Sequence, residues 1–161
     1  MKKNLDSQTL TEHFLTLALE EARKAKQQDE VPVGAVMVRN GVVIAAAHNQ
    51  KEINHNVFGH AEMLVIQKAV ENLGDWRLTD CVLYSTLEPC PMCAGALLHA
   101  RIKKVVFGAK DLKWGAAGSI IDILTPKLFN HQTEAVYHPM EACGAWIRDF
   151  FREKRSSCTR V

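Results

Sequence analysis

Two short segments carry side chains whose types and spacing suit metal chemistry: His60-Ala61-Glu62 and Pro89-Cys90-Pro91-Met92-Cys93. Residues three apart lie on one face of a helix, so the thiols of Cys90 and Cys93 can face a common point. A proline suits the first turn of a helix, where free N–H groups and a partial positive charge favour the thiolate, the form that binds metal. Taken alone, the cysteine pair is compatible with a catalytic zinc site, half of a structural zinc site, a redox pair or two inert thiols.

The residues around this pair favour a catalytic site. A closed structural zinc site needs four protein ligands, and the chain has no second Cys-x-x-Cys to supply them. His60, Cys90 and Cys93 give three ligands and leave a fourth position for water, whose pKa a zinc ion lowers to about 7. Glu62 is spaced to move that water's proton, first as general base and then as general acid. His-x-Glu followed by Pro-Cys-x-x-Cys is typical of zinc deaminases that act on nucleobases.

Length and composition predict a single domain over residues 1–161, which the two motifs make a zinc-dependent deaminase domain. Of the 161 residues, 47% are apolar and 24% charged, which is close to the average for globular proteins. A chain of this length buries enough surface to fold without disulfides. Five cysteines with no apolar leader indicate a reducing, cytoplasmic setting. No apolar run approaches the ~20 residues of a membrane span, so we expect no membrane partner.

Charge is distributed unevenly along the chain. Residues 1–80 carry 9 basic and 11 acidic side chains, a net −2, whereas residues 81–161 carry 11 basic and 7 acidic, a net +4. The basic excess forms two clusters, Arg101, Lys103, Lys104, Lys110 and Lys113, and Arg148, Arg152, Lys154, Arg155 and Arg160. These clusters are compatible with a polyanion-binding surface or with an ordinary solvated surface.

The elements that must position the two segments follow from periodicity. Apolar spacing and turn signals predict helices over 8–28, 60–73, 91–100 and 140–155, and strands over 33–38, 42–47, 81–85, 104–107 and 135–137. Asn40-Gly41 predicts a hairpin between the first two strands, and 109–119 reads as a loop. This order predicts an α/β fold, a three-layer α-β-α arrangement around a mixed five-stranded sheet. Each metal-binding segment then opens a helix.

With these motifs in place, the sequence resembles the bacterial tRNA-specific adenosine deaminases of the cytidine deaminase-like superfamily. The resemblance runs from about Glu12 to Arg155. Its segments are Val31–Val36, His48-Asn49, His60–Glu62, Thr86–Ala96, Val105–Asp111, Gly115–Ser119, Asn130-His131 and Asp149–Arg152. The zinc segments are common to the superfamily, whereas the Gly-Ala-Ala-Gly-Ser loop and the Phe-Phe-Arg helix resemble the tRNA enzymes in particular.

The resemblance implies an activity and an assembly. It implies a homodimer with one zinc ion per subunit, acting on the wobble adenosine in the anticodon stem-loop of an arginine tRNA and producing inosine. His60, Cys90 and Cys93 would hold the zinc, and Glu62 would shuttle the proton. The later strands of the sheet would all be parallel.

The resemblance also implies substrate contacts. Asn49 would hydrogen-bond the flipped nucleoside, and Phe150, Phe151 and Arg152 of the last helix would contact the anticodon loop. The chain departs from the family at Val57-Phe58-Gly59, a segment expected beside the pocket.

Two other functions fit parts of this pattern. A guanine or cytosine deaminase acting on a free base would use the same zinc ligands and the same glutamate. A zinc-stabilised RNA-binding module without turnover would not need Glu62. The basic C-terminal half, the Phe-Phe-Arg helix and the Gly115–Ser119 loop favour the tRNA enzyme over the free-base enzyme, and the presence of Glu62 favours it over the binding module.

Overall fold

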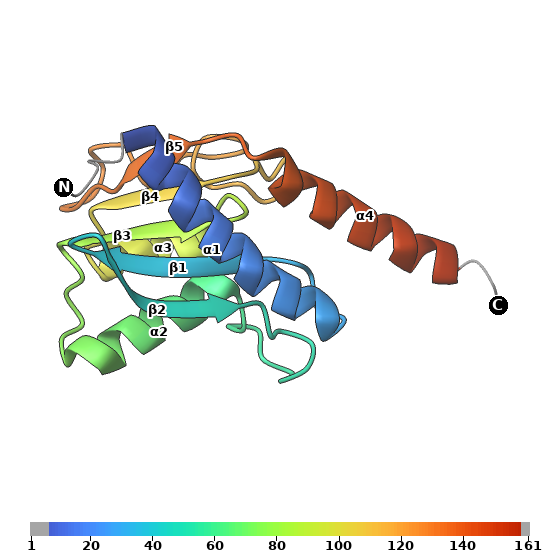
Figure 1. The fold of residues 1–161 in the computed structure, drawn as a ribbon. Helices are drawn as coiled ribbons and strands as arrows, with labels where there is room; N and C mark the ends of the chain where they lie inside the picture. Colours follow the sequence, from blue (N-terminus) through green and yellow to red (C-terminus); the bar gives the residue numbers. More distant parts are fainter. Residues whose placement is uncertain (1–6, 159–161) are drawn as a thin grey trace.

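A mixed five-stranded sheet forms the middle layer of the computed structural model, which describes residues 7–158 (Figure 1). The strand order is β2-β1-β3-β4-β5. Strand β1 is antiparallel to β2 and β3, whereas β3, β4 and β5 are parallel to one another. The elements are α1 (Ser7–Gln27), β1 (Gly34–Arg39), β2 (Val42–His48), α2 (Ala61–Leu73), β3 (Cys81–Ser85), α3 (Pro91–His99), β4 (Lys104–Phe107), β5 (Glu134–Tyr137) and α4 (Glu141–Cys158).

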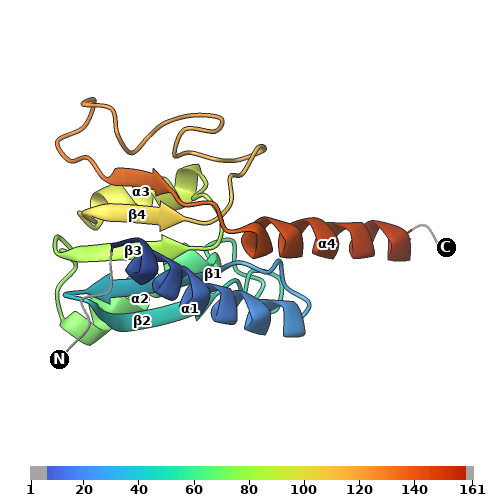
Figure 2. The ribbon, with the colours of Figure 1, turned by 45° about the horizontal axis from the view of Figure 1, so that its top comes forward.

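Helices cover both faces of the sheet, and the two views agree on this (Figures 1 and 2). Side chains alternate across β1, so Val36 and Val38 pack with Phe14 of α1, while Met37 belongs to the core on the face of α2 and α3. The predicted three-layer fold with a mixed five-stranded sheet is therefore confirmed.

The hairpin between β1 and β2 forms where the sequence predicts it. Asn40 and Gly41 both have positive φ angles, 51° and 75°, which a two-residue turn of this kind requires. Arg39 pairs with Val42 across the turn. The register shifts by one residue between Val38 and Met37, after which the pairing continues to Gly34 opposite His48, the last residue of β2 before Asn49.

Helix α1 lies unusually close to the sheet at Gly34. A Cβ atom at this position would be 2.1 Å from the carbonyl oxygen of Ala18 and 2.4 Å from the nitrogen of Ala22. A glycine is thus required for this contact between α1 and β1.

The connection from β4 to β5 differs from the alternation of helices and strands. The sequence predicts a loop over 109–119 and no element over 120–134, and in the structure the chain stays irregular to residue 133. Buried Ala116 and Leu124 anchor it to the core, and an isolated bridge joins Ala117 to Asp122. Figure 2 shows this long connection along the top of the view, above the orange strand β5.

Helix α4 begins at the edge of the sheet and extends beyond it (Figure 1). Cys143, near its start, and Phe150, near its middle, are buried. Within residues 7–158, no helix is long and apolar enough to cross a membrane.

Candidate metal centre and active site

The two metal-binding segments meet at the N-termini of α2 and α3. His60 and Cys90 each occupy the N-cap position with an extended backbone, and neither side chain caps its own helix. Both side chains are therefore free to face each other. The Sγ atom of Cys90 lies 3.6 Å from Nδ1 of His60 and 3.6 Å from Sγ of Cys93, and the Cys93 sulfur is also 3.6 Å from the same nitrogen.

This triangle fits a tetrahedral metal. Zinc–sulfur bonds of about 2.3 Å and zinc–nitrogen bonds of about 2.0–2.1 Å place neighbouring ligand atoms about 3.4–3.8 Å apart. His60, Cys90 and Cys93 form a group that could hold a metal ion. Both cysteines are free thiols, since their separation far exceeds a disulfide bond.

Hydrogen bonding within the triad shifts the pKa values of the two thiols in opposite directions. The bonds that Cys90 shares with Cys93 and His60 lower its pKa to about 4, against the cost of burial. The same sulfur contact, followed by burial, raises the pKa of Cys93. Contact with Cys90 raises the pKa of His60. The Cys90 sulfur is thus ready to ligate as a thiolate, and metal binding would release the remaining proton from Cys93.

Glu62 lies in the first turn of α2 with only 4% of its surface exposed. Burial raises its pKa to about 7, although the charge of His60 acts in the opposite direction. A carboxyl group with this pKa can hold and release a proton near neutral pH, as a general acid and base must.

A cavity of about 820 Å³ opens at this centre. Its volume is within the range of small-molecule sites. Four of its wall residues carry basic groups: Lys51, Lys110, Lys113 and Arg148. The candidate site residues in its wall are Asn49, His60, Glu62, Cys90 and Phe151, and it is also lined by Val31, Val33, Val57, Ala61, Leu87, Glu88, Pro91, Met92, Ala109, Asp111, Leu112, Trp114, Gly144 and Ile147.

The departure from the family pattern, Val57-Phe58-Gly59, is partly in this wall. Val57 lines the cavity, whereas Phe58 is 58% exposed and is not among its lining residues. Gly59 is required by packing, because a Cβ there would be 2.9 Å from the carbonyl oxygen of Gln50.

The three aromatic and basic residues expected to contact RNA fall in different environments. Phe151 is 43% exposed and lines the cavity. Phe150 is buried, with its ring edge-on to Phe151 and Lys154 over its face. Arg152 points to solvent and pairs with Asp149 at 2.7 Å.

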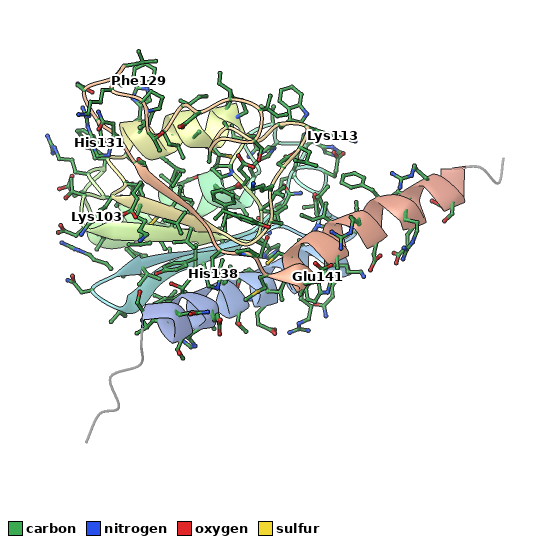
Figure 3. All side chains as sticks on the ribbon, turned by 90° about the horizontal axis from the view of Figure 1, so that it is seen from above. Lys103, Lys113, Phe129, His131, His138 and Glu141 are labelled. Atoms are coloured by element: carbon green, nitrogen blue, oxygen red, sulfur yellow. The ribbon has the colours of Figure 1, made fainter. Side chains whose placement is uncertain are left out.

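The first basic cluster is divided between two places. Lys110 and Lys113 line the cavity. Lys103 lies at the opposite side of the molecule from Lys113 in the view of Figure 3. Lys104 pairs with Glu134. Only part of this cluster can therefore face a ligand in the cavity.

Two buried glutamates near the site carry no motif and were not among the sequence candidates. Glu30 accepts hydrogen bonds from Asn49 and from the backbone of Ile53. Glu88, two residues before Cys90, accepts bonds from the 111–119 loop. Glu88 lies in the resembling segment Thr86–Ala96, which gave it no role, and Glu30 only precedes an apolar run, as many surface glutamates do.

Comparisons with known proteins identify the family and agree with the fold. A family model described as MafB19-like deaminase matches residues 11–155. The fold and this match define the protein as a deaminase.

Curated relatives narrow the class. The tRNA-specific adenosine deaminase of Bacillus subtilis (strain 168) is 50% identical over 148 residues, covering 91% of this chain and 92% of the relative. That of Aquifex aeolicus (strain VF5) is 42% identical over 146 residues, covering 91% and 97%. The chain belongs to the family of tRNA-specific adenosine deaminases.

Solved structures give the same relationship. A structure from a study of A-to-I editing by tRNA:A34 deaminases at the wobble position superposes with a TM-score of 0.75 at 44% identity, covering 79% of this chain and 98% of that one. The guanine deaminase of Bacillus subtilis superposes with a TM-score of 0.59 at 32% identity, covering 73% and 85%.

Proposed function

We propose that this protein deaminates the wobble adenosine of an arginine tRNA to inosine, with His60, Cys90 and Cys93 as zinc ligands and Glu62 as proton shuttle. The observation that carries the proposal is the buried Glu62 carboxyl in the wall of the same cavity as His60 and Cys90, two of the three members of a metal-sized triad of ligands. Relatives at 42–50% identity that are tRNA-specific adenosine deaminases support the choice of substrate.

The proposed reaction is a hydrolysis in which adenosine and water give inosine and ammonia. Zinc, when bound, supplies the Lewis acidity that brings the pKa of water close to neutral. Glu62 takes a proton from the attacking water and delivers it to N1 of the purine. It then takes the proton of the new C6 hydroxyl and passes it to the amine; the C6–N bond breaks, the hydroxyl becomes the carbonyl of inosine, ammonia leaves, and the carboxyl group ends in its starting state. Burial of Glu62 suits both transfers, because it keeps the carboxyl near its point of half-protonation at neutral pH.

The cavity mouth supports a single-stranded RNA substrate. A base inside a stacked loop cannot reach the metal centre, so it has to be splayed out. Exposed Trp114 and Phe151 offer aromatic faces for stacking, and Lys110, Lys113 and Arg148 are positioned for phosphates. Asn49 would bind the flipped nucleoside.

We further propose a single domain that acts as a homodimer in the cytoplasm with one zinc ion per subunit. One sheet with cores on its two faces across residues 7–158 supports the single domain. The homodimer rests on the family resemblance, and sedimentation analysis of the zinc-loaded protein tests it. Free cysteines at 81, 90, 93 and 143 are consistent with a reducing compartment.

One structural neighbour supports a second candidate function, the deamination of a free base. A guanine deaminase is among the structural neighbours. Measurement of inosine formation separates the two activities. Zinc-loaded protein is incubated in parallel with an arginine tRNA transcript carrying a wobble adenosine, with guanine and with cytosine.

Glu62→Gln is the test variant and Glu71→Gln, an exposed glutamate on the same helix, is its matched control. We expect inosine at the wobble position with the wild type and with the Glu71 variant, and none with Glu62→Gln although its zinc content is unchanged. Ammonia from guanine or cytosine with intact tRNA would refute the proposed substrate and support the free-base enzyme.

A further inference from the structure

Glu30 is a buried carboxylate that the proposed reaction does not use. It lies in the connection between α1, which ends at Gln27, and β1. The residue before it, Asp29, has a positive φ of 61°. Only 1% of its surface is exposed. Each carboxylate oxygen accepts one hydrogen bond, Oε1 from the backbone N–H of Ile53 at 2.6 Å and Oε2 from the side-chain amide of Asn49 at 3.1 Å.

The contacts of Asn49 fix which way its amide points. Its Nδ2 atom donates to Glu30 and also lies 3.4 Å from the carbonyl oxygen of Val31. Both neighbours can only accept, so the atom facing them has to be the nitrogen. The amide oxygen is then committed to the other side. The backbone N–H of Asn49 bonds to Val33 at 3.0 Å, so the residue is held at both ends.

The amide oxygen of Asn49 is a buried acceptor without a partner in the part of the chain that the structure describes. Asn49 is 94% buried, and within residues 7–158 its Oδ1 atom has no hydrogen-bond partner. A buried acceptor without a partner is costly, and a hydrogen-bond donor on a bound ligand would remove that cost. Asn49 lines the cavity that also contains His60 and Glu62.

We propose that Glu30 is a positioning residue that orients the Asn49 amide, so that the enzyme selects a hydrogen-bond donor on its nucleoside. The inference rests on the proposed function. It adds that Asn49 accepts, and the nucleoside donates, the hydrogen bond between them. Adenosine has two kinds of donor that could reach such an oxygen, the 6-amino group and the ribose 2′-hydroxyl. Its N1, N3 and N7 atoms only accept hydrogen bonds, so an amide oxygen would repel them.

Glu30→Gln tests the orientation directly. A glutamine can keep the bond from Ile53 with its oxygen and present an NH₂ group to Asn49. The Asn49 amide would then turn over and place a donor where the acceptor had been. We expect Glu30→Gln and Asn49→Ala each to lower kcat/KM on the tRNA stem-loop by about tenfold or more, the effect of one buried hydrogen bond.

A double-mutant cycle separates positioning from independent action. If Glu30 acts through Asn49, the double variant is no slower than the slower single variant; losses that multiply would overturn the proposal. Asn54→Ala, an exposed asparagine in the same loop, is the matched control and should retain wild-type activity. Thermal unfolding and zinc content are measured for every variant. If Glu30→Gln does not fold, Glu30→Asp takes its place, because it keeps the charge and withdraws the carboxylate from Asn49.

Two substrate analogues identify the donor. A stem-loop with 2′-deoxyadenosine at the target position lacks the hydroxyl, and one with purine riboside lacks the amine. Binding is measured in the Glu62→Gln background, where no turnover intervenes. The loss caused by Asn49→Ala should disappear for one of the two analogues, which names the group. A loss of equal size for both analogues and for adenosine would overturn the proposal.

The wild-type assay distinguishes the two levels of failure. Wild-type protein that leaves the tRNA unchanged would refute the proposed function and this inference together. Wild-type activity combined with independent, multiplying losses at Glu30 and Asn49 would refute the inference alone.

Discussion

Replacing Glu88 with glutamine should loosen the wall of the active site. Oε1 of Glu88 accepts the N–H groups of Ala117 and Ser119, each at 3.0 Å, and Oε2 accepts the Asp111 N–H at 3.0 Å together with the Ser119 hydroxyl. Only 1% of Glu88 is exposed. Gly115 is tightly fitted to it, since a Cβ there would lie 2.5 Å from Oε2.

The magnitude follows from these four bonds. A glutamine can keep its oxygen toward Ala117 and Ser119 and turn its NH₂ toward the Asp111 side, where the Ser119 hydroxyl can rotate to accept. The Asp111 N–H then faces another donor. Losing one bond to a charged acceptor and leaving a buried donor unpaired costs about 2–4 kcal/mol. For a domain of this size, that lowers Tm by roughly 4–16 °C.

Calorimetry and hydrogen exchange check this expectation on the zinc-loaded protein. The Asp111 amide should exchange faster in Glu88→Gln, and the variant should unfold at a lower temperature. Glu134→Gln is the matched control, because it removes only an exposed ion pair with Lys104 and should change stability by less than about 1 kcal/mol. A Glu88→Gln variant that unfolds within 1 °C of the wild type would refute the role given to this carboxylate.

Three further results are expected. Gly34→Ala should destabilise the protein by about 1–3 kcal/mol in urea unfolding, because its Cβ would overlap the backbone of α1. Gly95→Ala, with open space around it, should not destabilise the protein, and equal effects of the two substitutions would contradict the packing argument. Burial raises the pKa of Cys143 to about 12, so this thiol stays protonated well above the ordinary thiol range. It should resist iodoacetamide in the folded protein up to pH 9, measured by mass spectrometry. Alkylation as fast as in urea would disprove this expectation. Phe151→Ala should weaken tRNA binding about tenfold in a filter assay with little change in Tm, because Phe151 is exposed and lines the cavity. Phe150→Ala should mainly lower Tm, because Phe150 is buried. The reverse pattern would count against the cavity assignment.

Local sequence patterns predicted those parts of the fold that depend on near neighbours. The β1–β2 hairpin was predictable because Asn40-Gly41 tolerates positive φ angles at both positions. The meeting of His60 with Cys90 could be expected because the two motifs together supply three ligands for one metal ion, and the structure brings these residues to 3.6 Å.

Features that depend on distant contacts could not be predicted. Glu30 and Glu88 resemble surface glutamates in sequence, and their burial depends on donors up to 31 residues away. The irregular connection over 108–133 has no periodic pattern of its own, and Leu124 becomes core only because the loop folds back. The basic cluster at 101–113 was split because a strand and a turn separate its members in space.

The placement of the ligands on two helices has a consequence for the unfolded chain. His60 and Cys90 are 30 residues apart in sequence, and His60 and Cys93 are 33 apart. A metal held by all three would close a loop of that length, much as a disulfide does. A cross-link of this span removes chain entropy worth about 3–4 kcal/mol from the unfolded ensemble. The zinc ion proposed for this site would therefore also cross-link α2 and α3, so its removal should lower the free energy of unfolding by about 3–4 kcal/mol in addition to removing the proposed activity.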